Sequence, residues 1–311
     1  MNRFRVTCAL AVLALSLPMV SAEPAYANFP GRNGLLAFSA DTGTAGSQLF
    51  TVRSNGRQLQ QVTSGPGQAA QPDWSPDGAW LAYTLDDCTV ALVRPDGTGQ
   101  RTIASQTPDG CEGDPVFTPD GAHLVFSRYD PVVNEEAVWI MDLNGNDRRR
   151  IGTGPDGAQT PEVSPDGQTV TFLSSPTPGG LTALFAVSIT GGDARQVTPT
   201  LWGITFKHDW APDGSRLVVS DNAGDPSRPT NLLTIRPDGT GLVYLTDLQP
   251  ADQDAVAGGY SPDGKWIAYR LQDGEQRALM VVRTNGKGAH AVLPFSPFNP
   301  RYIDWGPAGA S

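Results

Sequence analysis

One tetrapeptide recurs along this chain and sets a structural period. Ser75-Pro76-Asp77-Gly78 returns four more times, with Ser, Thr or Ala in its first position, at intervals of 43 to 50 residues. An apolar triplet such as Leu81-Ala82-Tyr83 follows each copy after two residues. A fixed internal period of this length indicates one repetitive domain rather than two unrelated ones. The other copies are Thr118-Pro119-Asp120-Gly121, Ser164-Pro165-Asp166-Gly167, Ala211-Pro212-Asp213-Gly214 and Ser261-Pro262-Asp263-Gly264.

The residue types in the repeat are those of a tight turn between two strands. Proline sets the first corner of a type I turn, aspartate accepts hydrogen bonds from nearby backbone N–H groups, and glycine adopts the positive φ that lets the chain reverse. The chain has 35 glycines, 27 prolines and only 17% charged residues. We therefore expect many short strands and almost no helix after the N-terminus.

A second series of turns is independent of the first. Six dipeptides of the Asn-Gly kind lie between apolar runs, and such dipeptides favour two-residue hairpin turns. Each repeat then reads as strand a, the Pro-Asp-Gly turn, strand b, a variable loop, strand c, the Asn-Gly-like turn and strand d. Six four-stranded antiparallel units in a radial array predict an all-β, six-bladed β-propeller. The dipeptides are Asn55-Gly56, Asp96-Gly97, Asn144-Gly145, Gly191-Gly192, Asp238-Gly239 and Asn285-Gly286.

The two ends of the chain predict how the ring closes. The first repeat, over residues 35–63, has strands b, c and d but no strand a. The C-terminal segment Tyr302-Ile303-Asp304-Trp305-Gly306-Pro307 matches Pro72-Asp73-Trp74-Ser75-Pro76 and stops where a strand b would begin. The last strand should therefore complete the first blade, which removes the open edges of the ring.

The N-terminal segment is predicted to be removed. Two arginines precede an apolar run from Val6 to Val20, and small residues follow it, which is the pattern of a secretory signal peptide. A single membrane anchor is the alternative, but the run is short for a bilayer span. We expect cleavage after Ala27 rather than Ala22, so that residues 1–27 form the signal peptide and residues 28–311 the propeller.

The charge balance restricts the partners. The chain carries 22 Lys and Arg against 32 Asp and Glu, a formal net charge of −10 at pH 7. Nucleic acid is therefore not expected as a partner, because surfaces that bind it are basic. No later segment is apolar and long enough to span a membrane. The prediction is an exported monomer with no membrane span once the signal peptide is removed.

Two cysteines follow the signal peptide. Cys88 lies in a b–c loop and Cys111 in the next d–a loop, so the topology puts both on the same face of adjacent blades. In an exported protein this pair is predicted to form a disulfide. The bond would close a loop of about 22 residues and stabilise the fold by roughly 3 kcal/mol if chain entropy dominates. Metal ligation and a reactive thiol are the alternatives, and neither has supporting ligand spacing.

The turns and the variable loops fall on opposite faces of the predicted ring. Strands a and c run one way and strands b and d the other, so the Pro-Asp-Gly and Asn-Gly-like turns share one face, here called the turn face. The b–c and d–a loops differ in length between blades and share the other, here called the loop face. Binding residues on rigid scaffolds usually lie in such loops. We therefore place any ligand or partner on the loop face or at the mouth of the central channel.

Four acidic residues occupy one equivalent position on the innermost strands. A ring of carboxylates near the axis has the chemistry to hold a divalent cation, although Val116 and Gly259 break the ring. The alternative, which we favour, is that the carboxylates accept hydrogen bonds from loop backbone and neighbouring blades. The four residues are Asp73, Glu162, Asp209 and Asp304.

Other candidates lie outside the repeat pattern. His208 precedes Asp209 near the axis, and Trp202 lies in a variable loop. Phe295 and Phe298, in the last connection, are candidates for exposed contact. The tryptophans and tyrosines of the inner strands recur from blade to blade, which indicates packing between blades instead.

The sequence contains no catalytic constellation. The three histidines fall in different parts of the repeat, which argues against a His-rich metal site, and no Gly-x-Ser-x-Gly elbow is present. Glycine-rich dipeptides form turns here, because no helix follows them. No catalytic residue and no metal ligand is predicted, and a divalent cation in the channel is the one cofactor that the axial carboxylates leave open.

The run Asp73-Trp74-Ser75-Pro76-Asp77-Gly78, with Leu-Ala-Tyr after it, resembles the PD40, or TolB-like, β-propeller repeat. The resemblance covers essentially all of residues 29–311. The same repeat occurs in TolB, in propeller domains attached to peptidases and in many exported proteins. The small α/β domain that precedes the propeller in TolB is not expected here, because propeller sequence begins within a few residues of the predicted cleavage site. A TolA-type partnership is therefore not expected either.

The predicted function is that of a binding scaffold rather than an enzyme. The loop face is expected to bind a protein or a component of the cell envelope. The alternative from another class is a propeller enzyme, such as a lactonase-like hydrolase, that uses a cation held by the axial carboxylates. A third, a sensory or carbohydrate-binding module, requires exposed aromatic residues on the loop face. The predicted binding residues are Trp202, His208, Asp209, Asp73, Glu162 and Asp304.

Overall fold

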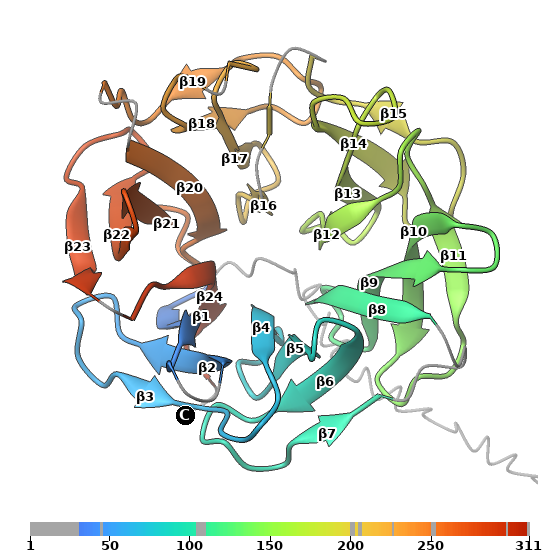
Figure 1. Ribbon diagram of the computed structural model, residues 1–311, viewed down its shortest axis with the longest axis horizontal. Helices are drawn as coiled ribbons and strands as arrows, with labels where there is room; N and C mark the ends of the chain where they lie inside the picture. The colour runs from blue at the N-terminus through green and yellow to red at the C-terminus, as the bar shows by residue number, and fades with distance from the viewer. Residues whose placement is uncertain are drawn as a thin grey trace, which may run out of the picture.

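The structure is a computed structural model that describes residues 31–43, 46–103, 110–199, 203–204, 207–225, 227–249, 253–296 and 298–309. These residues form six sheets of four antiparallel strands, arranged in a ring around a central axis (Figure 1). The predicted all-β, six-bladed propeller is thereby confirmed. Within the described ranges no helix is long and apolar enough to cross a membrane. The predicted signal peptide, residues 1–27, lies outside them.

The blades are numbered along the chain, and strands a to d run from the axis to the rim. Strands a, from blade 1 to blade 6, are β24 (Arg301–Pro307), β4 (Ala69–Trp74), β8 (Cys111–Phe117), β12 (Gln159–Val163), β16 (Asp209–Trp210) and β20 (Gln253–Tyr260). Strands b are β1 (Asn33–Asp41), β5 (Leu81–Leu85), β9 (His123–Asp130), β13 (Thr169–Ser174), β17 (Leu217–Asp221) and β21 (Trp266–Asp273). Strands c are β2 (Ser47–Val52), β6 (Thr89–Val93), β10 (Glu135–Asp142), β14 (Ala183–Ser188), β18 (Asn231–Ile235) and β22 (Gln276–Arg283). Strands d are β3 (Gln60–Gln61), β7 (Arg101–Thr102), β11 (Arg149–Gly152), β15 (Arg195–Gln196), β19 (Val243–Tyr244) and β23 (His290–Ser296).

Blade 1 joins the two ends of the described chain. β24 pairs with β1 in antiparallel fashion, with Leu36 opposite Trp305 and Ala37 opposite Asp304. This confirms the predicted closure of the ring by the C-terminal strand. The innermost strand of blade 1 is therefore supplied from the far end of the sequence, and closure leaves no gap at which the ring could open as a free edge.

The Pro-Asp-Gly turns show why the tetrapeptide recurs. In the first copy the hydroxyl of Ser75 donates to Asp77 Oδ1 at 2.6 Å, and the same oxygen accepts the N–H of Ala79 at 3.0 Å. Gly78 has a φ of 68°, which glycine adopts without steric cost. The aspartate therefore organises the turn and is not available for chemistry. The same hydroxyl-to-aspartate bond recurs at Thr118, Ser164 and Ser261.

The Asn-Gly-like turns have a second role, which the sequence pattern does not reveal. In blades 1, 2, 4, 5 and 6 they pack against backbone in, or directly after, the outermost strand of the preceding blade. A Cβ on Gly56 would lie 2.7 Å from the carbonyl oxygen of Val292, and one on Gly239 would lie 2.3 Å from that of Val197. Glycine is therefore required here for close approach between blades as well as for its positive φ.

The hydrophobic cores lie between adjacent blades. Trp74 packs with residues of blades 1 and 2, Trp210 with residues of blades 4 and 5, and Trp305 with residues of blades 6 and 1. All three side chains are buried. The predicted packing role of the inner-strand tryptophans is thereby confirmed, and these residues do not form a stacking surface for a ligand.

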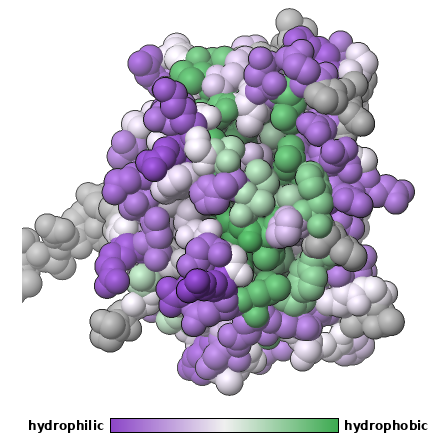
Figure 2. Space-filling model, turned by 90° about the vertical axis from the view of Figure 1, so that its left-hand side faces the viewer, coloured by the Kyte–Doolittle hydropathy of each residue, from purple (hydrophilic) through white to green (hydrophobic). Residues whose placement is uncertain are grey.

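The rim differs from one side of the ring to the other. β7, β11 and β15 carry arginines, whereas β23 is seven residues long and reads His-Ala-Val-Leu-Pro-Phe-Ser. On β19, Val243 and Tyr244 are also exposed. Figure 2 looks onto the side of the ring where β23 lies and shows a hydrophobic band between hydrophilic flanks. The rim is thus polar over blades 2 to 4 and more apolar over blades 5 and 6.

Candidate functional site

The mouth of the channel on the loop face is built from bulges in the innermost strands. Register shifts interrupt the a–b pairing in five of the six blades. Bulges of this kind often redirect side chains beside functional sites. In four blades, the residue two positions before the axial-carboxylate position has a positive φ, which costs about 1–3 kcal/mol in a non-glycine residue. These residues are Gln71 (φ 55°), Asp114 (φ 49°), Thr160 (φ 45°) and Tyr302 (φ 49°).

The bulges border a small cavity at this mouth. Its volume is about 30 Å³, which is room for one or two water molecules. All four positive-φ residues line it, so the repeated backbone strain and the cavity coincide. The lining residues are Gln71, Pro72, Asp73, Asp114, Pro115, Val116, Thr160, Pro161, Glu162, Lys207 and Tyr302.

A buried lysine lies among the axial carboxylates. Lys207 Nζ is 3.7 Å from Glu162 Oε1 and 3.8 Å from Asp304 Oδ1, and the lysine side chain is only 11% exposed. Burial by itself lowers the pKa of Lys207, but the surrounding carboxylates, Asp304 foremost, raise this pKa above its usual value. The lysine is therefore charged and offsets part of the negative charge around it.

Three of the predicted carboxylates hold the next blade by its backbone. Asp304 Oδ2 accepts the N–H of Trp74 at 3.0 Å, and Asp73 Oδ2 accepts the N–H of Phe117 at 2.8 Å. Asp209 Oδ2 likewise accepts an N–H from blade 6, at 2.6 Å. These bonds are of the kind that the hydrogen-bonding alternative predicts. These three carboxylates therefore connect successive blades by hydrogen bonds to the backbone.

The two gaps in the carboxylate ring have structural explanations. Blade 3 has Val116 at the axial position, and there Asp114 Oδ2 accepts the N–H of Thr160 in blade 4 at 3.1 Å. Blade 6 has Gly259, where a Cβ would lie 3.1 Å from Asp304 Oδ1. In blade 3, Asp114 therefore takes the role of the missing axial carboxylate. In blade 6, the absence of a side chain at Gly259 leaves space for the carboxylate of Asp304.

Burial governs the ionisation of this ring. It raises the pKa of Asp73 and of Glu162 well above the usual values, and it raises that of Asp209 to about 7. Repulsion from Asp304 adds to the shift in the pKa of Asp73 and of Asp209. The ring therefore resists full ionisation even with Lys207 at its centre.

His208 lies between blades 4 and 5 and is fully buried. Its Nε2 is 2.9 Å from Thr171 Oγ1 on β13. Burial, together with the charge of Lys207, lowers the pKa of His208 to about 3. The imidazole is therefore neutral at physiological pH, and it contacts the protein interior. Its role as a binding residue stays a prediction.

The described ranges contain no group of three or more His, Cys, Asp or Glu side chains arranged to hold a metal ion. The four axial carboxylates, although close enough to shift one another's pKa, instead engage Lys207 and backbone N–H groups. No resident cation was predicted here, and the alternative of a divalent cation in the channel stays open to metal analysis.

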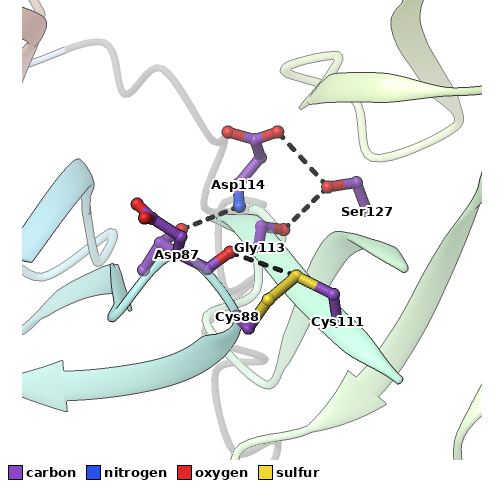
Figure 3. Close-up of a disulfide and its surroundings, with 7 residues drawn as sticks. Asp87, Cys88, Cys111, Gly113, Asp114 and Ser127 are labelled. Atoms are coloured by element: carbon purple, nitrogen blue, oxygen red, sulfur yellow. Dashed lines mark hydrogen bonds between the residues drawn. A yellow bond between two sulfur atoms is a disulfide. The ribbon is translucent and has the colours of Figure 1, made fainter. Parts of the chain in front are cut away.

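A disulfide braces the mouth beside blade 3. Cys88 and Cys111 are bonded, with their Cα atoms 4.4 Å apart, which confirms the predicted pair. Figure 3 shows the bond next to Asp114 and Ser127. The N–H of Asp114 donates to Thr84 Oγ1 at 3.0 Å, and the Ser127 hydroxyl donates to Asp114 Oδ2 at 3.2 Å. The disulfide thus anchors Cys111, the first residue of β8, three residues before Asp114 in the bulge.

The loop face also exposes large apolar side chains. Val132 is 89% exposed and Val133 is 64% exposed in the b–c loop of blade 3, and Leu181 is 42% exposed in that of blade 4. The b–c loop of blade 4 is bonded to the loop that joins blades 3 and 4, since the N–H of Gly179 donates to Asp156 Oδ2 at 3.0 Å. Apolar groups are therefore presented on loops that internal hydrogen bonds hold.

The remaining aromatic candidates have different outcomes. Phe295 is 39% exposed, as expected of a contact residue. Phe298 instead packs edge-on against Phe50, with ring centroids 4.6 Å apart, because the last connection folds back on the core between blades 6 and 1. Trp202 lies outside the described residues.

Sequence reasoning missed the bulges and Lys207. A signal for the bulges was present, because proline follows the positive-φ residue in blades 2, 3 and 4, and proline inside a strand marks a bulge or an edge. The sequence signal for Lys207 is weak. Like Gln71 and Tyr302, it lies two residues before an axial carboxylate, and nothing else distinguishes it. No short motif contains it.

The chain is similar to several known proteins. The profile of the TolB beta propeller domain family, PD40, matches residues 90–308. The chain is 26% identical over 192 residues to the uncharacterized peptidase YuxL of Bacillus subtilis, covering 50% of this chain and 29% of that protein. It is 24% identical over 294 residues to the uncharacterized protein Atu1656 of Agrobacterium fabrum, covering 76% of this chain and 97% of that one.

Among solved structures, TolB from Acinetobacter baumannii superposes with a TM-score of 0.71 at 20% identity, covering 88% of this chain and 67% of that one. Identity at this level shows the fold alone. The chain also spans less than a third of the length of the peptidase that it resembles, so that protein's activity cannot be read across.

Proposed function

Since the chain belongs to the TolB beta propeller domain family, we propose that it is an exported binding scaffold whose loop face captures a protein or another component of the cell envelope. The observation that carries the proposal is the exposure of Val132, Val133 and Leu181 at the tips of variable loops. Exposed apolar side chains on a polar scaffold, such as the adjacent Val132 and Val133, are typical of interaction sites.

The described part of the turn face is built from short turns that resemble one another. Its turns are closed by local hydrogen bonds, as where Asp96 Oδ1 accepts the N–H of Thr98 at 2.9 Å and Asp238 Oδ1 accepts that of Thr240 at 2.9 Å. Side chains that are already engaged and alike in every blade offer little to distinguish one partner from another. The loops of the opposite face differ in length and composition, which suits specific recognition.

Export is supported by two independent features. The N-terminal sequence has the order of charged, apolar and small residues found in secretory signal peptides. The Cys88–Cys111 disulfide suits an oxidising compartment outside the cytosol. The scaffold is proposed to act as a monomer, which light scattering on the purified mature protein would check.

A photo-crosslinking experiment tests the binding face. A photoreactive residue is placed at Leu181 on the loop face and, as a matched control, at Lys287 in a turn of blade 6. We expect adducts with an envelope component from position 181 and none from position 287. Adducts of equal yield from both positions would contradict the proposal.

Variants then test the apolar contact itself. In the crosslinking form with the probe at Leu181, the double change Val132→Asp and Val133→Asp should abolish the adduct, because charge replaces the apolar contact. Leu59→Asp, at an exposed apolar residue on the rim of blade 1, should leave it unchanged. An adduct that survives the double change would show that these valines do not bind the partner.

The enzyme alternative has its own test. Metal analysis of the purified mature protein, combined with hydrolase assays on lactones, should find neither a stoichiometric cation nor turnover. A bound cation accompanied by turnover that falls on Asp73→Asn would replace the scaffold with an enzyme.

A further inference from the structure

The loop face carries a second feature, a cluster of three arginines where blade 6 meets blade 1. Arg270 lies on β21 and Arg277 on β22, while Arg301 begins β24. Gln272 pairs with Arg277 across the two strands of blade 6. Since alternate residues of a strand share a face, Arg270, Gln272 and Arg277 project from the same side of the blade.

That side faces blade 1. Ala268, two residues before Arg270, and Leu279, two residues after Arg277, both lie in the core that blade 6 shares with blade 1. β24 of blade 1 lies beside β20 and β21 (Figure 1). The arginines therefore stand at the loop-face end of this inter-blade seam, where the apolar core gives way to solvent.

The positive charges are close enough to affect one another. Burial lowers the pKa of Arg270 to about 10, and repulsion from Arg277 and Arg301 adds to the shift. Burial and the charge of Arg301 also lower the pKa of Arg277. Asp254 is the weakest of the influences on Arg270. A protein with a net charge of −10 thus concentrates three guanidinium groups at one place.

Two of the three arginines have no carboxylate partner among the residues that the structure describes. Neither Arg277 nor Arg301 forms an ion pair with another described residue, whereas Arg148 pairs with Glu112 at 2.5 Å. Arg277 Nε donates to Gln272 Oε1 at 3.2 Å, which leaves its terminal nitrogens for another acceptor. Arg301 is exposed. The cluster is therefore arranged to receive an anion from outside.

We infer that Arg270, Arg277 and Arg301 bind carboxylates of an acidic segment in a protein partner. A guanidinium presents two parallel N–H donors that match the two oxygens of a carboxylate. Phe295 is 39% exposed and adjoins Ser296, which pairs with Arg277. An acidic peptide with an apolar side chain would use both the charges and the aromatic ring, whereas a phosphate polymer would use the charges alone.

This inference rests on the proposed function in one respect, because it takes the loop face as the binding face. It adds the chemistry of the partner and a second contact area, distinct from Val132, Val133 and Leu181 on blades 3 and 4. The two proposals can therefore fail separately. A crosslink at Leu181 that persists in a protein without the arginine cluster would leave the scaffold intact and remove only this partner chemistry.

The test is a titration of the full mature protein with a labelled peptide, blocked at both ends, of sequence Glu-Glu-Phe-Glu-Glu, followed by fluorescence anisotropy at low salt. We expect binding that weakens as salt is added, because exposed charges are screened. Arg277→Gln and Arg301→Gln should each weaken it about fivefold or more. Arg277→Lys should retain part of the affinity, since it keeps the charge but loses the two-pronged geometry.

Matched controls make the result specific. Arg283→Gln removes an arginine that stacks on Trp266 by the turn face and should leave binding unchanged, and the peptide Lys-Lys-Phe-Lys-Lys should not bind. Absence of binding by the acidic peptide, or equal binding by the Arg277→Gln/Arg301→Gln double variant, overturns the inference. Tighter, arginine-dependent binding of pyrophosphate, with no gain from the phenylalanine of the peptide, overturns it in favour of a phosphate ligand.

Discussion

Two charged clusters lie toward the loop face, one at the channel mouth and one at the seam between blades 6 and 1, and they differ in how their charges are satisfied. The axial carboxylates accept backbone N–H groups of the next blade and surround Lys207. In the arginine cluster, Arg277 and Arg301 have no carboxylate partner among the described residues. The first cluster therefore holds the ring together, and the second keeps its charge for something else. Conspicuous residue types in a repeat are thus a poor guide to function until their partners are known.

The largest effect on this comparison should come from Lys207→Met. The change leaves Glu162 and Asp304 buried without their cation, and breaking a buried charge pair in this way costs about 3–5 kcal/mol. We expect a loss of that size in the free energy of unfolding, measured by guanidinium denaturation at pH 7. Lys287→Met, on the exposed turn face, is the control and should change it by less than about 0.5 kcal/mol. A loss below about 1 kcal/mol for Lys207→Met would show that the ring does not depend on its lysine.

The disulfide comes next in expected effect. Replacing Cys88 and Cys111 together by serine should lower the free energy of unfolding by about 3 kcal/mol, because the loop that they close regains its freedom in the unfolded chain. The same denaturation experiment measures it. Wild-type protein treated with reductant should match the variant, and a reduced protein as stable as the oxidised one would disprove the bracing role beside Asp114.

The sequence predicted the fold because the fold is a repeat. The five tetrapeptides and the six Asn-Gly-like dipeptides specify turns by local backbone chemistry, and their period gives the number of blades and the closure. The position of the axial carboxylates, for instance Asp73 before Trp74, followed from the same alignment. Each of these features is local or periodic, so one chain was enough to find them.

The site was only partly predictable, because its parts come from different blades. Arg270 and Arg301 belong to different blades and are separated in the sequence by β22 and β23, and the two come close because β24 returns to blade 1 beside blade 6. Whether Asp209 binds a cation or a backbone N–H depends on the position of the neighbouring strand β20. No local sequence motif predicts that position. Thr160 shows a further limit, since nothing except the proline after it signals that a β-branched residue adopts a positive φ.

A third prediction concerns the pH dependence of the carboxylate ring. The pKa of Asp209 is about 7 in the folded protein and 3.8 in the reference state. Between these values the folded state binds a proton that the unfolded state does not, so this contribution to stability is present at lower pH and is lost as pH rises through 7. Asp73 and Glu162, whose pKa values are also raised, act in the same direction.

The clearest window lies between pH 6.5 and 8, because His208 opposes the trend below it. The pKa of His208 is lowered to about 3, so below about 6.5 the unfolded state gains a proton on this residue that the folded state lacks. We expect the midpoint of thermal unfolding to fall from pH 6.5 to pH 8 and the fall to be smaller in Asp209→Asn. An equal or steeper fall in that variant would exclude Asp209 as a source.

The smallest effect on stability should come from substitutions in the arginine cluster. This small effect would distinguish the arginine cluster from the ring of axial carboxylates. Arg277→Gln and Arg301→Gln remove charges that repel one another at the surface, and neither leaves a described carboxylate without its partner. Each should therefore change the free energy of unfolding by less than about 0.5 kcal/mol. The denaturation experiment used for Lys207→Met measures both. A loss of about 2 kcal/mol or more would place these arginines with the carboxylates, as residues that hold blades 6 and 1 together. Unchanged stability joined to weakened binding of the acidic peptide would instead mean that the arginine cluster serves a ligand rather than the fold.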